Sequence, residues 1–201
     1  GDDKSGNTND WAENNIAASD QMLDSPTNNF CTLNPLDSES TLSEGNLKTT
    51  SSGGWQDANT SFPSLDNGKW YYEASSTSIP SSGYGLLYMT VDGTTVGIYP
   101  DGTVIGGAPS VTYTSNDIIG VTFDSTANEI KFYKNNVYQG VKSITINNVV
   151  IKFQNYVGKY WAVNFGQDSS FAGTKTAQGN QDSNDIGDFY YTPPTGFLAL
   201  C

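Results

Sequence analysis

Short runs of β-branched and aromatic residues, separated by turn-forming residues, recur through most of this 201-residue chain. Between residues 69 and 165 these runs follow one another about every 8 to 12 residues, the spacing typical of all-β domains. The turns include Asn67-Gly68 and Asp92-Gly93, pairs that favour tight hairpins between antiparallel strands. No segment longer than a turn or two shows the period of a helix. The pattern predicts an all-β protein, an antiparallel two-sheet β-sandwich.

The expected domain covers residues 26–201, and the polar residues 1–25 are expected to be a linker from a preceding domain. A first strand at 30–33 is predicted to end at Asn34-Pro35, because proline cannot donate to a β-ladder. Residues 42–47 are typical of a short hairpin or turn. The remaining strands are predicted at residues 69–74, 85–91, 95–99, 103–105, 118–123, 129–134, 137–141, 149–153 and 160–165, with a closing strand within 189–201.

The chain has 9 Lys but no Arg and no His. Without His it lacks a Ser-His-Asp triad and an imidazole metal site, and without Arg it lacks a bidentate carboxylate or phosphate clamp. A net charge of -12 argues against nucleic acid as a partner, because phosphate binding needs a positive face. No apolar run approaches the roughly 18 residues of a transmembrane helix, so membrane insertion is not expected.

The two cysteines, Cys31 and Cys201, lie far apart and lack the spacing of a zinc site. A disulfide between them requires the two regions of the chain to meet, and two separate thiols are the alternative. Because Cys201 is the last residue, we expect the sequence to stop inside a longer protein.

The positions of the carboxylates test whether the chain is a glycosidase. Some β-sandwiches are glycosidases, and these enzymes use two carboxyl groups. No Glu-x-Asp-x-x-Glu cluster occurs, and Glu73, inside an expected strand, is predicted to be structural. The segment 182–188 contains oxygen ligands of the kind that Ca²⁺ prefers, on Asp182, Asn184, Asp185 and Asp188. Ile186 falls where a further ligand is needed, so we expect a solvated loop, with no metal and no other cofactor.

Several segments together resemble one known family. The runs 116–124 and 129–140 resemble the central signature of SPRY domains, in which one strand leads to a second that ends in a "F-x-x-N-G" turn. Gly68–Glu73 is similar to the early "G-K-x-Y-x-E" strand, and Val163–Gln167 to the late "N-F-G-Q" strand. Asn136 stands where the family usually has Gly, and Asn also tolerates a positive φ. The resemblance covers residues 66–172 and implies a SPRY, concanavalin A-like jelly roll.

The flanks resemble a second group of proteins. Asn9-Asp10-Trp11 and the segment 24–35 are similar to the lead-in of large tail or other virion proteins of marine bacteriophages, and residues 191–201 are similar to their closing strand. This resemblance implies a binding domain on a phage virion, in its tail or on its surface, and therefore an extracellular location.

In SPRY domains, loops at one rim of the sandwich bind the partner. The resemblance therefore implies a ligand-binding rim at Trp55, Tyr84, Tyr113, Asn155 and Tyr156, although a loop aromatic can also simply close the end of a sandwich. We expect a non-catalytic module that recognises a host-surface glycan or protein and that forms oligomers through the full-length protein. The alternatives are a structural domain that contacts other virion proteins and a glycan-degrading enzyme.

Overall fold

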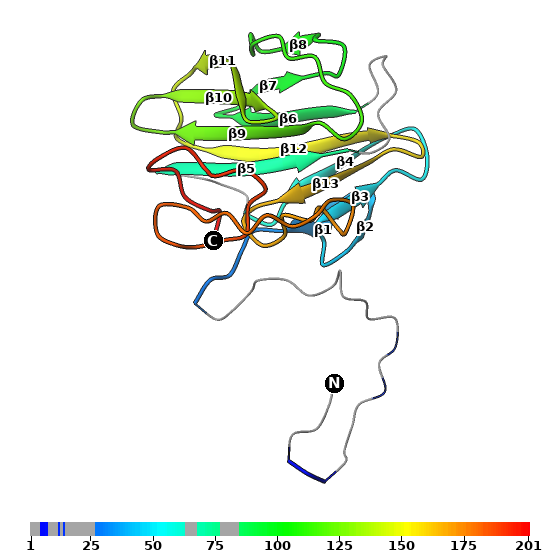
Figure 1. The fold of residues 1–201 in the computed structure, drawn as a ribbon. Coiled ribbons are helices and arrows are strands. Elements are labelled where there is room, and N and C mark those ends of the chain that lie inside the picture. The colour runs from blue at the N-terminus through cyan, green and yellow to red at the C-terminus, as the bar shows by residue number, and fades with distance from the viewer. Residues whose placement is uncertain (1–4, 8–11, 13, 15–26, 63–67, 77–84) are drawn as a thin grey trace.

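A computed structural model describes residues 5–7, 12, 14, 27–62, 68–76 and 85–201. Within these residues the chain forms thirteen strands in two antiparallel sheets (Figure 1). The predicted all-β sandwich is therefore confirmed. The described residues include no helix that is long and apolar enough to cross a membrane.

The six-stranded sheet has the order β1-β4-β12-β6-β7-β8. β12 lies near its middle and pairs with β4 on one side and with β6 on the other. Side chains alternate along β12, with odd-numbered residues from Val149 to Asn155 buried and even-numbered residues partly exposed. The strands are β1 (Leu33–Ser38), β4 (Trp55–Thr60), β6 (Leu86–Val91), β7 (Thr94–Ile98), β8 (Val104–Ile105) and β12 (Val149–Tyr156).

The seven-stranded sheet has the order β11-β10-β9-β5-β13-β3-β2. Its centre is the pair β5 and β9, in which Tyr72 faces Val121 across the strands. Every residue of β9 is buried, because both faces of the sheet are covered at this point. The strands are β2 (Thr41–Ser43), β3 (Lys48–Thr50), β5 (Lys69–Ser75), β9 (Ile118–Asp124), β10 (Glu129–Lys134), β11 (Val137–Ser143) and β13 (Tyr160–Asn164).

Aromatic side chains fill the space between the two sheets. The ring of Tyr72 on β5 stacks on Phe123 with centroids 6.0 Å apart and meets the edge of Phe153 at 6.1 Å. Such ring pairs add a modest stabilisation to the burial of their apolar area. Trp70 is only partly buried against this core. The fully buried rings include those of Phe123, Phe132, Phe153, Trp161 and Phe165.

The structure corrects the prediction for the N-terminal strands. The first strand does not end at Pro35 but runs over Leu33–Ser38, which is possible because β1 is an edge strand and one of its sides needs no hydrogen-bond partner. No strand was expected at Trp55–Thr60, yet β4 lies between β1 and β12.

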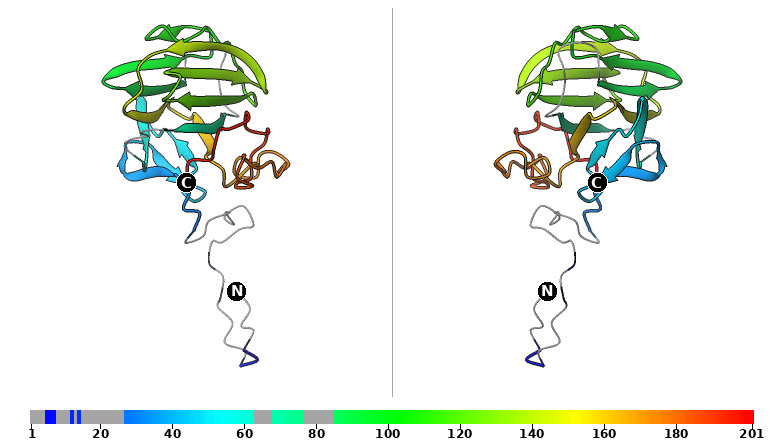
Figure 2. Two further views of the ribbon diagram at one scale, coloured as in Figure 1. Left: turned by 90° about the vertical axis from the view of Figure 1, so that its left-hand side faces the viewer. Right: turned by 90° about the vertical axis from the view of Figure 1, so that its right-hand side faces the viewer.

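Residues 166–201, which we name the C-terminal arm, contain no strand, so the predicted closing strand is not formed. The arm instead makes one parallel bridge, between Trp70 and Leu198. Figure 2 shows it, coloured orange to red, gathered on one side of the sandwich. Its side chains pack on the outer face of the seven-stranded sheet, where Tyr71 lies in a cluster with Phe189 and Phe197. The arm therefore closes much of the outer face around β5.

The two cysteines are free thiols, so Cys31 and Cys201 do not form the disulfide that was one of the two alternatives from the sequence. Cys31 is buried, Cys201 is exposed, and burial raises the pKa of the Cys31 thiol to about 11. The two regions of the chain nevertheless meet, because Cys31 N donates to Leu200 O at 2.8 Å. A buried thiol of high pKa is unreactive, which gives Cys31 the role of a small core residue.

Candidate functional site

The outer faces of the two sheets differ in accessibility. On the seven-stranded sheet, the outward side chains of Tyr71 and Glu73 are only 2% and 0% exposed, because the C-terminal arm covers them. On the six-stranded sheet, the outward side chains of β4 and β12 are all partly or fully exposed. The structure therefore presents β4 and β12 as a surface that a ligand can reach.

The most exposed feature of this surface is an aromatic pair, Trp55 and Tyr156. The two residues lie directly opposite each other on β4 and β12, with ring centroids 5.4 Å apart and an angle of 62° between the rings. Trp55 is 43% exposed, and the neighbouring Val157 is 45% exposed. A large apolar ring held at the surface by a second ring is typical of a recognition site.

Local turns fix the aromatic pair at the end of the sheet. β4 starts directly after Gly53-Gly54, and Gly54 has a φ of 61° that most residues avoid. β12 ends at Tyr156 in a tight turn in which Gly158 has a φ of 73° and Lys159 N donates to Tyr156 O. Both rings are thus placed where their strands leave the sheet.

A hydrogen-bonded group of polar side chains adjoins the aromatic pair. Asp57, two residues after Trp55 on the same face, accepts hydrogen bonds from Gln154 Nε2 at 2.8 Å and from Tyr88 Oη at 2.9 Å. Burial and then the bond to Asp57 raise the pKa of Tyr88, so its hydroxyl stays a donor. These bonds fix the Asp57 carboxylate on the sheet surface beside the rings.

Polar side chains also occupy the next outward positions along the strands. Asn59 Nδ2 donates to Asp37 Oδ2 at 2.8 Å, and Glu39 Oε2 accepts a bond from Asp57 N at 3.2 Å. Lys152, opposite both Asn59 and Tyr88, places its Nζ 5.9 Å from the centroid of the Tyr88 ring. The face therefore combines an aromatic end with a row of donors and acceptors.

The structure brings together only some of the predicted rim residues. Trp55 and Tyr156 form the exposed pair, whereas Asn155 points inward, 1% exposed, with its Nδ2 donating to Thr49 O and Oγ1 at 3.3 Å. Tyr113 is also 1% exposed, and its hydroxyl donates to Gly85 O and Ile98 O. Asn155 and Tyr113 are therefore core residues, which corrects their prediction as ligand contacts. Tyr84 lies outside the described residues.

Three residues of this surface were not predicted from the sequence: Tyr88, Asp57 and Gln154. Each lies on a strand between neighbours of opposite orientation, so the side of the sheet that it faces depends on the register of β4, β12 and β6. For Gln154 the sequence does carry a signal, the alternation along residues 149–156, which assigns Gln154 and Tyr156 to one outward face.

The candidate Ca²⁺ ligands hold the arm together instead. Asp182 accepts backbone N–H bonds from Asn184, Ile186 and Ala199, and Asp188 accepts bonds from Ser169 and Gly179. Backbone N–H groups and the Ser169 hydroxyl thus engage the carboxylate oxygens of Asp182 and Asp188. Asp185 has a φ of 57° in the turn between them. In the part of the chain that the structure describes, no group of three or more His, Cys, Asp or Glu side chains is placed to hold a metal ion.

Glu73 anchors the C-terminal arm to β5. Its Oε1 accepts bonds from Tyr71 Oη at 3.0 Å and Tyr191 N at 2.8 Å, and its Oε2 accepts bonds from Tyr190 N at 2.9 Å and Asn164 Nδ2 at 3.2 Å. Burial raises the pKa of Glu73 to about 7, against the lowering effect of these four bonds. A carboxyl group enclosed in this way stabilises the fold and does not face solvent.

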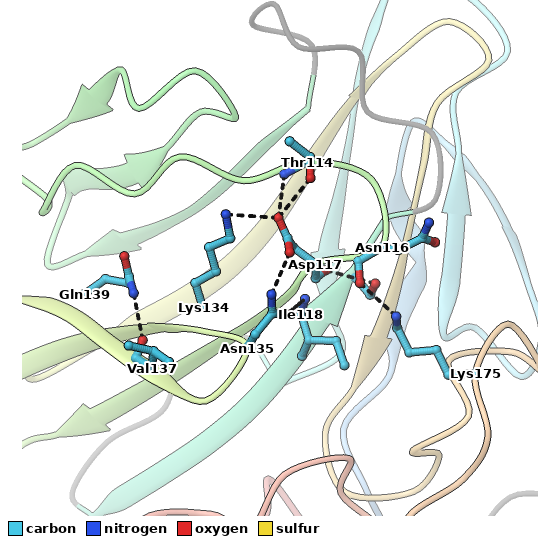
Figure 3. Close-up of polar contacts among 10 residues, drawn as sticks. Thr114, Asn116, Asp117, Ile118, Lys134, Asn135, Val137, Gln139 and Lys175 are labelled. Atoms are coloured by element: carbon cyan, nitrogen blue, oxygen red, sulfur yellow. Dashed lines mark hydrogen bonds and ion pairs between the residues drawn. The ribbon is translucent and has the colours of Figure 1, made fainter.

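A second polar network, at one end of the strands of the same sheet, explains part of the SPRY-like signature (Figure 3). Asp117 accepts bonds from Thr114 N at 2.9 Å and Asn135 Nδ2 at 2.6 Å, and pairs with Lys134 Nζ at 3.2 Å. Partial burial raises the pKa of Asp117, but these hydrogen bonds together lower it by more, so the net shift is downward. The network ties the start of β9 to the turn between β10 and β11, a structural role.

Comparison with known proteins gives a likeness of fold and none of sequence. No protein-family model matches the chain, and no curated protein matches its sequence. A carbohydrate-binding module of Bacillus subtilis, CBM66, superposes with a TM-score of 0.43 at 10% identity, over 66% of this chain and 91% of that one, which is too low to establish a shared fold.

Two SPRY domains superpose better. The SPRY domain of human HERC1 has a TM-score of 0.57 at 13% identity, over 65% of this chain and 96% of that one. The PSpry domain of TRIM65 has a TM-score of 0.51 at 14% identity, over 67% of this chain and 91% of that one. At these identities the likeness extends to the fold alone: the chain forms a SPRY-like β-sandwich.

Proposed function

We propose that this chain is a non-catalytic binding module of a phage virion, part of a tail fibre or another surface protein, that recognises a glycan or protein on the host surface. The observation that carries the proposal is the aromatic pair Trp55–Tyr156, exposed at the end of a sheet whose outer face is accessible. Aromatic anchors of this kind supply much of the binding energy at recognition sites.

The side chains at this site favour contact over catalysis. Asp57 is bonded to Gln154 and Tyr88, an arrangement that orients a hydrogen-bonding surface. Glu73, the carboxyl group with the raised pKa, is enclosed under the C-terminal arm on the other sheet. The chain supplies no His and no Arg to activate a nucleophile or to stabilise a developing charge.

Location on a virion rests on the resemblance of the flanks to phage virion proteins. A net charge of -12 is suited to a domain that stays soluble on a particle surface. Several copies on one particle would raise the overall affinity well above that of a single domain, so a weak individual site suffices.

The test is binding of the purified domain to envelope fractions of the host, with Trp55→Ala and Tyr156→Ala as variants. Both are expected to lower the affinity about tenfold or more, because each removes an aromatic anchor. The matched control is Tyr138→Ala, since Tyr138 is 52% exposed on β11 of the other sheet. Undiminished binding by both Trp55 and Tyr156 variants would refute the proposed site. Release of reducing sugar from host polysaccharide, lost in Asp57→Asn, would refute the non-catalytic assignment.

One observation favours a second function, a structural domain that contacts other virion proteins. β11 is an edge strand of the seven-stranded sheet, and it exposes Val137, Tyr138 and Val141 at 62%, 52% and 38%. Exposed apolar edge strands are prone to pair with another chain. If host fractions are not bound while Val137→Lys disrupts particle assembly, the structural function holds and the proposed recognition function fails.

A further inference from the structure

The aromatic pair and the adjoining Asp57–Gln154 pair form one continuous surface on β4 and β12. Trp55 and Asp57 are two residues apart on one face, and their cross-strand partners are Tyr156 and Gln154. We infer that this surface binds a neutral glycan, with one sugar ring stacked on Trp55 and the hydroxyl groups of the sugar donating to Asp57. The inference rests on the proposed binding function and names its ligand class.

Trp55 provides the stacking surface. The C–H face of a sugar ring is apolar, and its burial against an indole ring removes apolar area from water. The edge contact with Tyr156, at 5.4 Å between centroids, restricts the Trp55 side chain before any ligand arrives. Less conformational entropy is therefore lost on binding, which favours a rigid ring over a mobile one.

Asp57 provides the hydrogen-bond acceptor. Residues two apart on a strand are about 7 Å apart along it, the scale of a single sugar ring. An ionised carboxylate can accept about four hydrogen bonds, and in the structure each oxygen of Asp57 accepts one from a side chain, Gln154 on Oδ1 and Tyr88 on Oδ2. The carboxylate is thus oriented by its protein donors and retains capacity for the hydroxyl groups of a sugar.

The charges on this face select against acidic sugars. Asp57 lies beside Glu39, which accepts its backbone N–H, and beside Asn59, which is bonded to Asp37. These three carboxylates outnumber the ammonium group of Lys152, which lies over the Tyr88 ring on the same face. An anionic glycan would meet a negative surface on a chain of net charge -12, and repulsion of like charges lowers its affinity.

The experiment is a glycan array of neutral and acidic glycans probed with the intact chain, followed by titration of the best neutral ligand. Trp55→Ala and Asp57→Asn are each expected to weaken binding about tenfold or more, since a stacking ring or a charge-assisted hydrogen bond is lost. Asp37→Asn is the matched control: it removes the same charge from the same face at a carboxylate bonded to Asn59, and it is expected to change neutral binding by less than about twofold.

Thermal unfolding of each variant confirms that the sandwich is intact before affinities are compared. A preference for acidic glycans, or a loss in Asp37→Asn equal to that in Asp57→Asn, would overturn the inference. If the chain binds host fractions through Trp55 but binds no glycan on the array, the ligand is a protein. The inference of a glycan ligand then fails, while the proposed binding function stands. If Trp55→Ala binds host fractions as well as the unchanged chain, the proposed function fails as well.

Discussion

The stability of this protein is expected to fall as the pH rises from 4.5 to 7, because Glu73 keeps its proton in the folded state. Burial raises the pKa of Glu73 from its ordinary 4.5 to about 7. Between these values the unfolded chain releases the proton and the folded chain retains it, so the free energy of unfolding decreases with pH. A shift of this size corresponds to about 3 kcal/mol, present in full below pH 4.5 and lost above pH 7.

Glu73→Gln separates this effect from the other carboxylates of an acidic chain. A glutamine does not titrate. Its side-chain NH₂ group would face N–H groups that donate to the carboxyl oxygens of Glu73, so one donor stays without an acceptor and the variant is less stable by about 1–3 kcal/mol. That offset does not depend on pH. The unfolding free energy of the unchanged protein minus that of the variant should therefore fall by about 3 kcal/mol from pH 4.5 to pH 8, and so reach or pass zero.

Denaturant unfolding across this pH range measures the difference, and equal m-values in the two proteins are the control that the same transition is compared. A difference that stays constant with pH would show that Glu73 has an ordinary pKa in the folded state. A difference that grows with pH would show that the four donors, Tyr71, Asn164 and the amides of Tyr190 and Tyr191, outweigh the cost of burial. Either result would contradict a Glu73 that stays protonated in the folded protein.

Two further predictions concern packing and turns. Phe153→Ala is expected to lower the free energy of unfolding by about 3–5 kcal/mol, because the ring is fully buried between Tyr72 and Trp161. Chemical denaturation measures this loss, and a loss below about 1 kcal/mol would contradict the described core. Gly106→Ala should destabilise far more than Gly158→Ala, although both have a positive φ, since a Cβ at Gly106 would overlap the Thr95 carbonyl while Gly158 faces open space. Similar melting temperatures for the two variants would argue against that turn.

The sequence predicted the strands that carry their own local signals. β9 is buried along its whole length, β10 alternates between buried and partly exposed residues, and β9 to β11 are joined by Asn-rich turns in which Asn128, Asn135 and Asn136 adopt positive φ. Such residues mark both the strand and its end. For this reason the fold class and most strand positions could be predicted without a structure.

β4 could not be predicted, and neither could half of the candidate site. Its sequence, from Trp55 to Thr60, places an exposed tryptophan outward and Gln56 inward, the reverse of the usual pattern. The strand forms because β1 and β12 supply hydrogen bonds on both sides. Long-range pairing of this kind leaves no mark in the local sequence, so Asp57 was missed.

The position of the C-terminal arm on the sheet could not be predicted from the local sequence either. Glu73 bonds to Tyr190 and Tyr191, more than a hundred positions away in the chain. A polar segment rich in Gly, Ser and Asp has the composition of a loop. The buried acceptor Glu73 on β5 and the apolar cluster around Tyr71 order it as a cover for the sheet.

The hydrogen bond between Cys31 N and Leu200 O has a mechanical consequence. The chain enters and leaves the sandwich at neighbouring points, so a pulling force applied across residues 31 and 200 loads that single contact first and then peels the C-terminal arm from the sheet. Both residues are buried in the hydrophobic cluster between the two sheets, so tension across them acts on the core as well as on the arm.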